Sequence, residues 1–310
     1  MIKMLHRTGF DTLVLDDLST GFESALRGSE WVKGSIGDAD ILESIFSRYS
    51  FGAVMNFASF IAVGESVKKP SEYYLNNVAN TLVLLDMMQR HKVQRYIFSS
   101  TAAIFGNPIS VPIREDSVRS PINPYGRSKH MIEQVLEDFD AAYGIKSVCL
   151  RYFNAAGADP EGELGERHNP ETHLIPLVLQ VAAGRRDTVS IFGDDYDTPD
   201  GTCIRDYIHV QDICGAHLLA LHHLLAGGGS RRYNLGNGIG FSVRDVIDEA
   251  RRITGRSIPV TTEQRRDGDC ATLIADSRLI IEELGWQPER SDLATILQDA
   301  WAWEQKWPWH

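Results

Sequence analysis

Short apolar runs alternate with amphipathic helical stretches along the first half of this 310-residue chain. Helical periodicity covers 71–91 and 125–143, and strand-like runs lie on either side of each stretch. Such alternation predicts a parallel sheet with helices on both faces, because a helix must carry the chain back before the next strand can start in the same direction. We therefore expect an α/β fold with a doubly wound parallel sheet. Its strands should cover 12–15, 31–33, 53–57, 96–99 and 147–151.

The start of the chain lacks one part of this pattern. Residues 1–10 have the character of a helix end that stops at Gly9, with no strand before it. Asp16 and Asp17 close the next strand. In a dinucleotide-binding unit an acid at that place accepts hydrogen bonds from the adenosine ribose, about 20 residues after a glycine-rich turn. This spacing predicts that the first strand and its turn precede Met1. The alternative is that the two acids only begin a turn.

The second half of the chain differs in composition. After about residue 155 it becomes rich in Gly, Pro and Asp, before helical stretches resume at 174–184 and 210–226. We expect residues 1–155 to form the dinucleotide-binding domain, incomplete at its N-terminus. Residues 156–310 should form mainly a smaller mixed lobe, with some segments returning to the first domain.

Charge and composition exclude several classes of protein. The net charge of −11 argues against a nucleic-acid partner, because phosphate binding needs a concentrated basic face, and no run of about 18 apolar residues predicts a membrane span. The four cysteines are too far apart for a zinc knuckle or a redox pair, and no secretory signal precedes them, so we expect a cytoplasmic protein. His217 and His222 would lie on different faces of a helix, and we expect no metal site.

A Tyr–Lys pair is the first candidate for chemistry. Tyr125 and Lys129 lie at i and i+4, on one face of the helix expected to begin near Pro124. A lysine ammonium one turn away, together with a nicotinamide cation, would favour the phenolate and make Tyr125 a base near neutral pH. Such a pair also occurs by chance, so its surroundings matter. Thr101 ends an apolar strand, and the carboxyl ends of parallel strands face the crevice where ligands bind.

The glycine-rich segment 236–240 is a poor match to a dinucleotide-binding turn. Its third glycine comes one residue too early, and Phe241 stands where that glycine should be. Ser242 and Asp245 have the spacing of a capping box at a helix start. We therefore predict an ordinary strand–turn–helix here.

Four segments carry a resemblance to a known family. They are 99–106, 124–129, 151–154 and 205–210, with the sequences SSTAAIFG, PYGRSK, RYFN and RDYIHV. Through these segments the chain resembles the UDP-glucose 4-epimerases, which are extended short-chain dehydrogenases, along essentially its whole length. The resemblance implies a Rossmann-like fold. The related nucleotide-sugar dehydratases have an acidic residue directly after the threonine, whereas Ala102 and Ala103 follow it here, which favours epimerisation.

The resemblance also implies an isomerase that interconverts UDP-galactose and UDP-glucose by transient oxidation at C4, with NAD as cofactor. Tyr125, Lys129 and Thr101 would be its catalytic residues. Two positions depart from the family pattern, since Ser35 replaces a common acid and Ile61 replaces a frequent lysine. The implied NAD contacts are Asp16, Asp17, Thr20, Ser35, Ile36, Phe57, Ala58, Ser59, Asn76, Lys129, Tyr152 and Phe153.

The substrate implied by the resemblance is a UDP-sugar. Arginine suits its doubly charged diphosphate, because a guanidinium donates paired N–H groups and stays charged. Family members commonly form homodimers through a four-helix bundle, so a homodimer is expected. The implied substrate contacts are Thr101, Tyr125, Asn154, His173, Arg205, Arg266 and Asp269.

Two alternatives stay open. The chain could be a catalytically dead, N-terminally truncated fragment, because a missing central strand would leave two unpaired sheet edges. It could also be a related epimerase that acts on another nucleotide sugar, such as UDP-N-acetylglucosamine.

Overall fold

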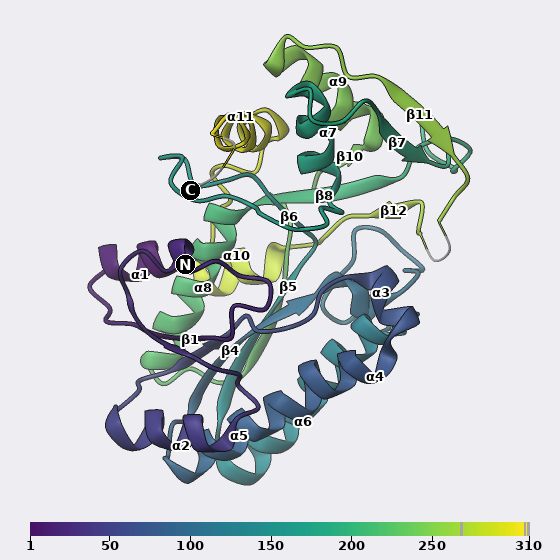
Figure 1. The fold of residues 1–310 in the computed structure, drawn as a ribbon. Helices are drawn as coiled ribbons and strands as arrows, with labels where there is room; N and C mark the ends of the chain where they lie inside the picture. The colour runs from purple at the N-terminus through teal and green to yellow at the C-terminus, as the bar shows by residue number, and fades with distance from the viewer. Residues whose placement is uncertain (267–268, 307, 309–310) are drawn as a thin grey trace. The chain divides into compact units, whose positions relative to one another are not determined.

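The computed structural model describes residues 1–266, 269–306 and 308. The chain forms two compact units (Figure 1). Unit 1 consists of Met1–Asn107, Asp116–Arg151 and Ala216–Tyr233, and unit 2 consists of Pro108–Glu115, Tyr152–Gly215 and Asn234–His310.

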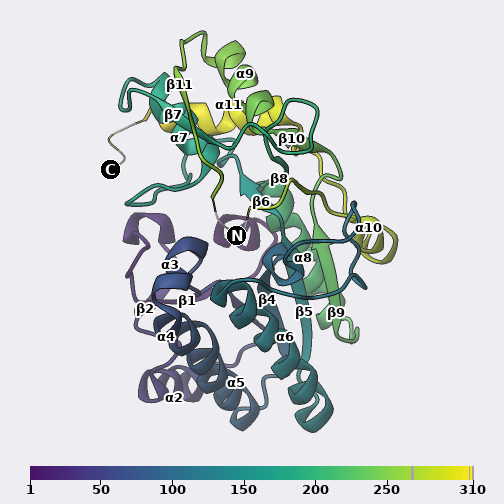
Figure 2. The same cartoon turned by 90° about the vertical axis from the view of Figure 1, so that its right-hand side faces the viewer.

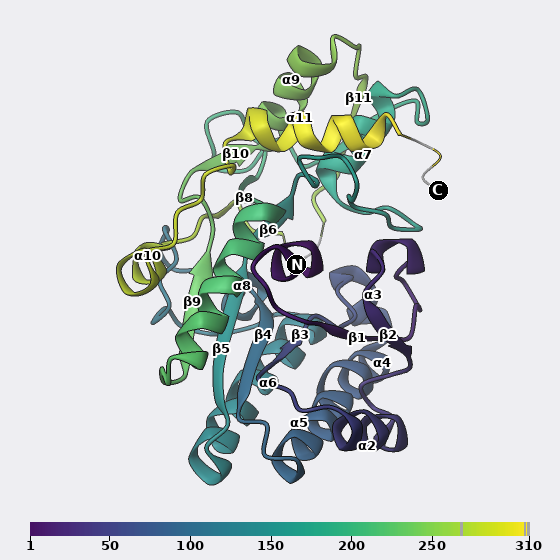
Figure 3. The ribbon, with the colours of Figure 1, turned by 90° about the vertical axis from the view of Figure 1, so that its left-hand side faces the viewer.

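Unit 1 contains a parallel sheet in two parts (Figure 3). In the smaller part, β1 (Leu13–Asp16) runs parallel to β2 (Glu30–Lys33). Four strands make the larger part in the order β3-β4-β5-β9, in which β3 and β4 are parallel. These four are β3 (Val54–Asn56), β4 (Arg95–Thr101), β5 (Lys146–Tyr152) and β9 (Arg231–Leu235).

No pairing between β1 and β3 occurs in the described part of the chain, so the sheet is interrupted there. The five strands predicted from the sequence are all present, and their ends lie within two residues of the predicted ones.

Three helices cover one face of these strands (Figure 2), namely α2 (Ala39–Arg48), α5 (Asn80–Arg90) and α6 (Pro124–Tyr143). Their apolar sides form a core with β4, in which Leu85 of α5, Phe98 of β4 and Leu136 of α6 are fully buried. Each such side chain contributes about 1.5–3 kcal/mol through its burial.

Helix α1 (Ile2–Arg7) and the unit 1 part of α8 (Val210–Leu225) lie on the opposite side of the strands (Figure 3). Phe10 follows α1 in the chain, and its ring contacts His222 of α8, with 5.8 Å between the ring centroids. Helices therefore cover both sides of the sheet, as the predicted doubly wound fold requires.

The helix predicted over 71–91 is divided in the structure. It consists of α4 (Pro70–Tyr73), a π-helical segment η2 (Tyr74–Ala79) and α5, and α3 (Val63–Lys68) precedes it. Two 3-10 turns complete unit 1, η1 (Glu23–Leu26) and η3 (Ala102–Phe105).

Unit 2 is built around β8 (Ile204–His209). It pairs antiparallel with β10 (Gly240–Ser242) and parallel with β12 (Thr272–Leu273) and β6 (Asn154–Ala156). A separate parallel pair is formed by β7 (Val189–Phe192) and β11 (Val260–Glu263).

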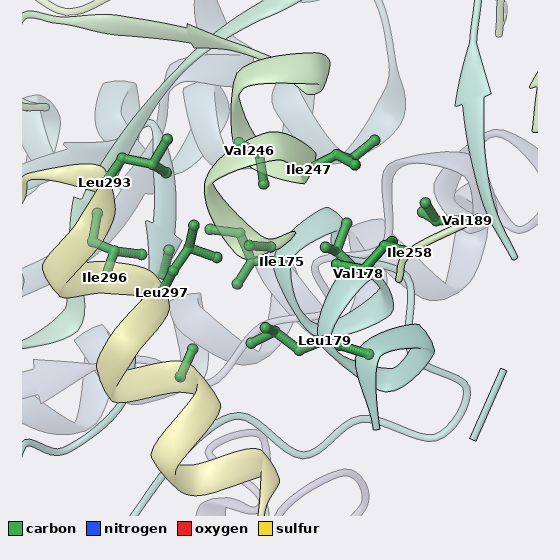
Figure 4. Packing of buried hydrophobic residues seen from close by; sticks show 14 of the residues in the cluster. Ile175, Val178, Leu179, Val189, Val246, Ile247, Ile258, Leu293, Ile296 and Leu297 are labelled. Carbon is green, nitrogen blue, oxygen red and sulfur yellow. The ribbon is translucent and has the colours of Figure 1, made fainter. Parts of the chain in front are cut away.

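The core of unit 2 lies between α7 (Leu174–Ala182), α9 (Val243–Thr254) and α11 (Leu293–Glu304) (Figure 4). Val178, Val246 and Ile296, one from each helix, have no exposed surface. Helix α10 (Arg278–Leu284) follows β12. None of the described helices combines the length and the apolar character that crossing a bilayer requires.

Candidate active site

Close packing of α6 on the turn η3 places Tyr125 beside Thr101. The side chain of Asn123 caps α6 and accepts a hydrogen bond from the Gly126 amide (2.8 Å). A Cβ atom at Gly126 would lie 2.5 Å from the carbonyl oxygen of Ala103, so glycine allows this approach. The Thr101 hydroxyl accepts from the Ala103 amide (3.1 Å) and shares a hydrogen bond with the Tyr125 side chain.

Lys129 lies one helical turn after Tyr125 and is only 2% exposed. Its Nζ donates to the Ser59 Oγ and to the Ser99 carbonyl oxygen, both at 2.8 Å, and lies 4.8 Å from the centroid of the Phe98 ring. An ammonium group has three donors, so one donor remains after these two hydrogen bonds. Burial disfavours the charged form and lowers the pKa of Lys129 to about 7.

The burial of Tyr125 works against the phenolate form. Burial raises the pKa of Tyr125, and the hydrogen bond with Thr101 offsets only part of this rise. The Lys129 Nζ lies 6.0 Å from the Tyr125 ring centroid and donates to Ser59 and Ser99. The prediction that Lys129 and a bound nicotinamide cation together favour the phenolate stays a prediction. A fixed positive charge beside the phenol would reverse the shift.

A buried asparagine that the sequence analysis missed links this site to the segment after β3. Asn77 has no exposed surface, and its side chain exchanges two hydrogen bonds with the backbone of Phe60 (2.8 and 3.1 Å). It also donates to the Ser128 hydroxyl of α6 (3.1 Å). The predicted cofactor residue Asn76 donates to Asn77 (3.1 Å). Both belong to the π-helical segment, which sequence periodicity does not distinguish from an ordinary helix.

The residues expected to bind adenosine lie where β1 and β2 end. Asp16 Oδ1 accepts from the Leu18 amide (2.7 Å) and Asp17 Oδ1 from the Ser19 amide (2.9 Å), so the turn that was the alternative interpretation is present. One such bond leaves most of the acceptor capacity of a carboxylate unused, and the turn is therefore compatible with ribose binding. Of the other predicted residues at this end, Thr20 is exposed and Ser35 and Ile36 are half-buried.

The surroundings of Lys129 fit the nicotinamide end of NAD. Its amine is buried, carries an unused donor and has no carboxylate among its hydrogen-bond partners. Phe57 and Ala58, which follow β3, are exposed, and the Phe57 ring contacts His217 at a tilt of 31°, with 4.8 Å between ring centroids. A flat aromatic cofactor and its ribose hydroxyls suit an apolar, donor-bearing surface of this kind.

In unit 2 the structure brings together three of the predicted substrate residues. Asp269 lies between two arginines: its Oδ2 accepts from Arg266 Nε (3.0 Å), and its Oδ1 is 3.6 Å from Arg205 Nη2. Arg205 also donates to the carbonyl oxygens of Ile204 (2.9 Å) and Cys270 (2.8 Å), which fix its direction. Two guanidinium groups and one carboxylate leave a net positive charge, which suits a diphosphate.

The other predicted residues of unit 2 have separate partners. Asn154 donates to the Asp206 carbonyl oxygen (3.0 Å) across the β6–β8 pair. Phe153, which follows Tyr152, donates its amide to the Leu235 carbonyl oxygen (3.2 Å). His173 contacts Glu166 rather than a member of the Arg205 group.

Four polar side chains around His173 form a cluster that the sequence analysis did not predict. Glu166, His168, Glu171 and His173 place polar atoms within 4.8 Å of one another. Burial raises the pKa of Glu166, but hydrogen bonds with His168 and His173 outweigh it and bring that pKa down to about 2. Hydrogen bonds with Glu166 and Glu171 raise the pKa of His168 to about 10. The spacing Glu-x-His-x-x-Glu-x-His within the Gly- and Pro-rich segment is the sequence feature from which this cluster could have been predicted.

The turn at 236–240 holds a carboxylate of its own chain. The amides of Asn237 and Gly238 donate to Asp206 at 2.8 and 3.1 Å. A Cβ atom at Gly236 would lie 2.3 Å from the Asp206 Oδ2, so glycine is required there. Ser242 and Asp245 form the predicted capping box of α9, which confirms the strand–turn–helix.

Comparison with known proteins decides the family. The NAD dependent epimerase/dehydratase family matches residues 1–236. The chain belongs to this family. A UDP-glucose 4-epimerase of Halalkalibacterium halodurans is 50% identical over 99% of this chain and 92% of that protein.

Solved structures agree with this family membership. The UDP-glucose 4-epimerase of Brucella ovis in complex with NAD is 49% identical, with a TM-score of 0.94 over 96% of this chain and 92% of that one. The UDP-Glc/GlcNAc 4-epimerase of Campylobacter jejuni is 42% identical, with a TM-score of 0.84 over 98% of this chain and 94% of that one. The predicted Rossmann-like fold and relation to the UDP-glucose 4-epimerases are confirmed. The domain boundaries and the roles of single residues stay predictions.

Proposed function

We propose that this chain is a UDP-glucose 4-epimerase, an NAD-dependent isomerase that interconverts UDP-galactose and UDP-glucose. The arrangement of Tyr125, Thr101 and Lys129 at the end of β4 carries the proposal, because it joins a proton acceptor, a hydroxyl relay and a buried amine. The relatives named above supply the identity of the sugar.

In this proposal Tyr125 takes the proton of the sugar 4-hydroxyl, directly or through the Thr101 hydroxyl that is hydrogen-bonded to it. Lys129 and Ser59 would hold NAD, which would supply the acceptor for the C4 hydride and, once reduced, the donor that returns this hydride to the opposite face of the 4-keto sugar. Tyr125 then gives the proton back to the C4 oxygen, which completes the inversion. Ala102 and Ala103 follow Thr101 and place no acid there that could expel water from the sugar.

Lys129 and Ser59 would hold the nicotinamide ribose. The Lys129 Nζ keeps one donor beyond its bonds to Ser59 and Ser99, and this donor can bind a ribose hydroxyl. Asp16 would accept from the adenosine ribose at the end of β1, as acids at this position do in dinucleotide-binding units.

Arg205 and Arg266 would bind the diphosphate of the substrate. Asp269 holds both guanidinium groups before substrate arrives, through contacts of 3.6 and 3.0 Å. Such prior placement reduces the side-chain entropy lost on binding. Asn154 and His173 are the further substrate residues of this proposal.

The assembly and location belong to the proposal too. A homodimer through η2, α5 and α6 is supported by one exposed apolar side chain on each, since Leu75, Leu82 and Met131 are 61%, 39% and 41% exposed. A cytoplasmic location is supported by four free cysteines. Light scattering of the purified chain tests the dimer, and a monomer mass would refute it.

The activity is tested by incubating the purified chain and NAD with UDP-galactose and measuring UDP-glucose. We expect turnover in the parent and a loss of at least about a hundredfold in Tyr125→Phe, the usual size of a lost general base. The control is Tyr143→Phe, which changes an exposed tyrosine at the end of the same helix and should keep full activity. UDP-N-acetylgalactosamine is assayed in parallel. Turnover of the N-acetylated sugar alone would favour the alternative substrate, and turnover of neither would refute the proposal.

A further inference from the structure

Four side chains in the segment 166–173 of unit 2 direct polar atoms to one place. The His168 Nδ1 lies 3.1 Å from the Glu166 Oε1 and 3.6 Å from the Glu171 Oε1. The His173 Nδ1 hydrogen-bonds the same Glu166 oxygen and lies 3.8 Å from the Glu171 Oε1. Two imidazoles and two carboxylates therefore converge.

Three of the four separations, 3.1, 3.6 and 3.8 Å, are close to the edges of a tetrahedron around zinc, and the His173–Glu166 hydrogen bond would have to lengthen to that size. Zinc binds imidazole nitrogen and carboxylate oxygen at about 2.0–2.2 Å, which places the ligands of a tetrahedral site about 3.3–3.6 Å apart. Both carboxylates are also sheltered, since the side chains of Glu166 and Glu171 are 20% and 6% exposed. Sheltered carboxylates need a positive partner, which hydrogen bonds with His168 and His173 supply in this structure, and a divalent cation carries enough charge to replace both imidazole protons.

We propose that Glu166, His168, Glu171 and His173 bind one divalent transition-metal ion of the zinc type. Imidazole nitrogen selects such ions over Mg²⁺ and Ca²⁺, which prefer oxygen. Four protein ligands fill a tetrahedral site, so the ion is structural. A second group of metal-capable side chains in the described chain offers carboxylates alone and supports no proposal: Asp159, Glu161 and Glu163.

Hydrogen bonds of the segment hold these ligands in place. The Trp303 Nε1 donates to the Glu166 carbonyl oxygen (3.1 Å). The Glu171 Oε1 accepts from the amides of Thr172 (2.7 Å) and His173 (2.9 Å). Because these contacts fix the backbone and one carboxylate, little further ordering is needed when the ion binds.

The ion would also determine which nitrogen of His173 carries a proton. A neutral imidazole has one donor and one acceptor nitrogen, so a metal at Nδ1 leaves the proton on Nε2. This consequence rests on the proposed function, in which His173 binds substrate and its Nε2–H donates to an oxygen of the UDP-sugar. We expect removal of the ion to raise KM for UDP-galactose several-fold and to leave kcat within twofold.

Metal binding to the full chain tests the site directly. The chain is stripped with a chelator and titrated with ZnCl2 while bound zinc is counted, and with CoCl2 while the visible spectrum is recorded. We expect one zinc ion per chain and the intense visible bands of tetrahedral cobalt. His168→Asn and Glu171→Gln should each lower zinc affinity at least tenfold.

His91→Asn is the matched control. It removes a surface histidine whose Nε2 lies 3.1 Å from the Glu43 Oε1, a contact of the same kind without a second histidine, and it should bind zinc as the parent does. Equal zinc uptake by the parent and His168→Asn would overturn the proposal. If His168→Asn does not fold by circular dichroism, the cobalt spectrum of the parent decides, and weak octahedral bands or no saturable uptake would overturn it. A parent without epimerase activity would refute the proposed function while leaving the zinc count valid.

Discussion

The Nζ of Lys129 lies 2.8 Å from the Oγ of Ser59, which follows β3, and the Ser99 carbonyl oxygen is its other acceptor. Neither partner is negatively charged, so the buried ammonium has no countercharge among them. This explains why burial lowers the pKa of Lys129 from 10.5 to about 7.

This arrangement predicts a pH-dependent stability. Between pH 7 and 10.5 the unfolded chain keeps a proton on Lys129 that the folded chain releases, so stability rises with pH in that window. Lys129→Met should remove up to about 1.4 kcal/mol per pH unit from the slope of the unfolding free energy. Urea unfolding at pH 7, 8 and 9 measures it. Lys68→Met changes an exposed lysine and serves as control. An unchanged slope in Lys129→Met would show that the amine stays charged in the fold.

The Thr101 hydroxyl should set the pH at which the enzyme gains activity. Its hydrogen bond lowers the pKa of Tyr125 against the rise caused by burial. Thr101→Val should therefore raise that pKa further and move the ascending limb of the kcat/KM profile to higher pH, because the phenolate is the active form. Thr101→Ser keeps the hydroxyl and should leave the limb in place. A profile that moves equally in both variants would exclude this role.

Packing at Gly126 should control the distance between Tyr125 and Thr101. Gly126→Ala puts a Cβ atom 2.5 Å from the Ala103 carbonyl oxygen and must move α6 away from η3. We expect a loss of about 1–3 kcal/mol in stability and at least tenfold in kcat, since small displacements of catalytic groups are costly. Thermal unfolding and steady-state kinetics measure both effects.

Gly64→Ala is the matched control, because a Cβ atom there meets nothing within 4 Å and Gly64 lies inside α3. It should stabilise the chain by about 0.5–1 kcal/mol. If Gly126→Ala and Gly64→Ala changed stability and kcat to the same extent, close packing would not be the reason why residue 126 is a glycine.

The sequence predicted what depends on local pattern. Strand and helix positions follow from periodicity, and the i, i+4 spacing placed Tyr125 and Lys129 on one face of α6 before the fold was known. Burial is not visible in such spacing, so the rise that burial causes in the pKa of Tyr125 was not predicted. Contacts between distant segments were not predicted either, among them those of Lys129 with Ser59 and of Asn77 with Phe60. These contacts depend on how β3, η2 and α6 pack together, and the sequence of any one segment does not determine that packing.

The buried Glu133–Arg151 pair should be important for folding. Arg151 Nη2 lies 2.7 Å from Glu133 Oε2, both side chains are at most 1% exposed, and the Ser100 hydroxyl donates to the other Glu133 oxygen at 2.6 Å. Arg151→Met leaves the buried carboxylate with only Arg232, whose Nε is 3.6 Å from the Glu133 Oε2, as a positive neighbour, and should cost about 3–5 kcal/mol. Urea unfolding measures the loss, and the double variant with Glu133→Leu should recover part of it.

An exposed ion pair provides the comparison. Arg90 Nη2 and Asp86 Oδ2 are also 2.7 Å apart, but these side chains are 60% and 54% exposed. Arg90→Met should cost no more than about 1 kcal/mol. A similar cost for Arg90→Met and Arg151→Met would mean that burial does not determine the effect.

The carboxylate of Asp206 occupies the glycine-rich turn at 236–240, which could be mistaken for a phosphate-binding loop. This carboxylate takes the amide hydrogens of Asn237, Gly238 and Ala275 at 2.8, 3.1 and 3.0 Å, as a bound anion would. Asp206→Ala should convert this turn into an open receptor for small anions, and acetate or formate added to the solvent should restore part of the lost stability. The turn is thus an anion-binding site whose bound anion is the carboxylate of Asp206 on the neighbouring strand β8.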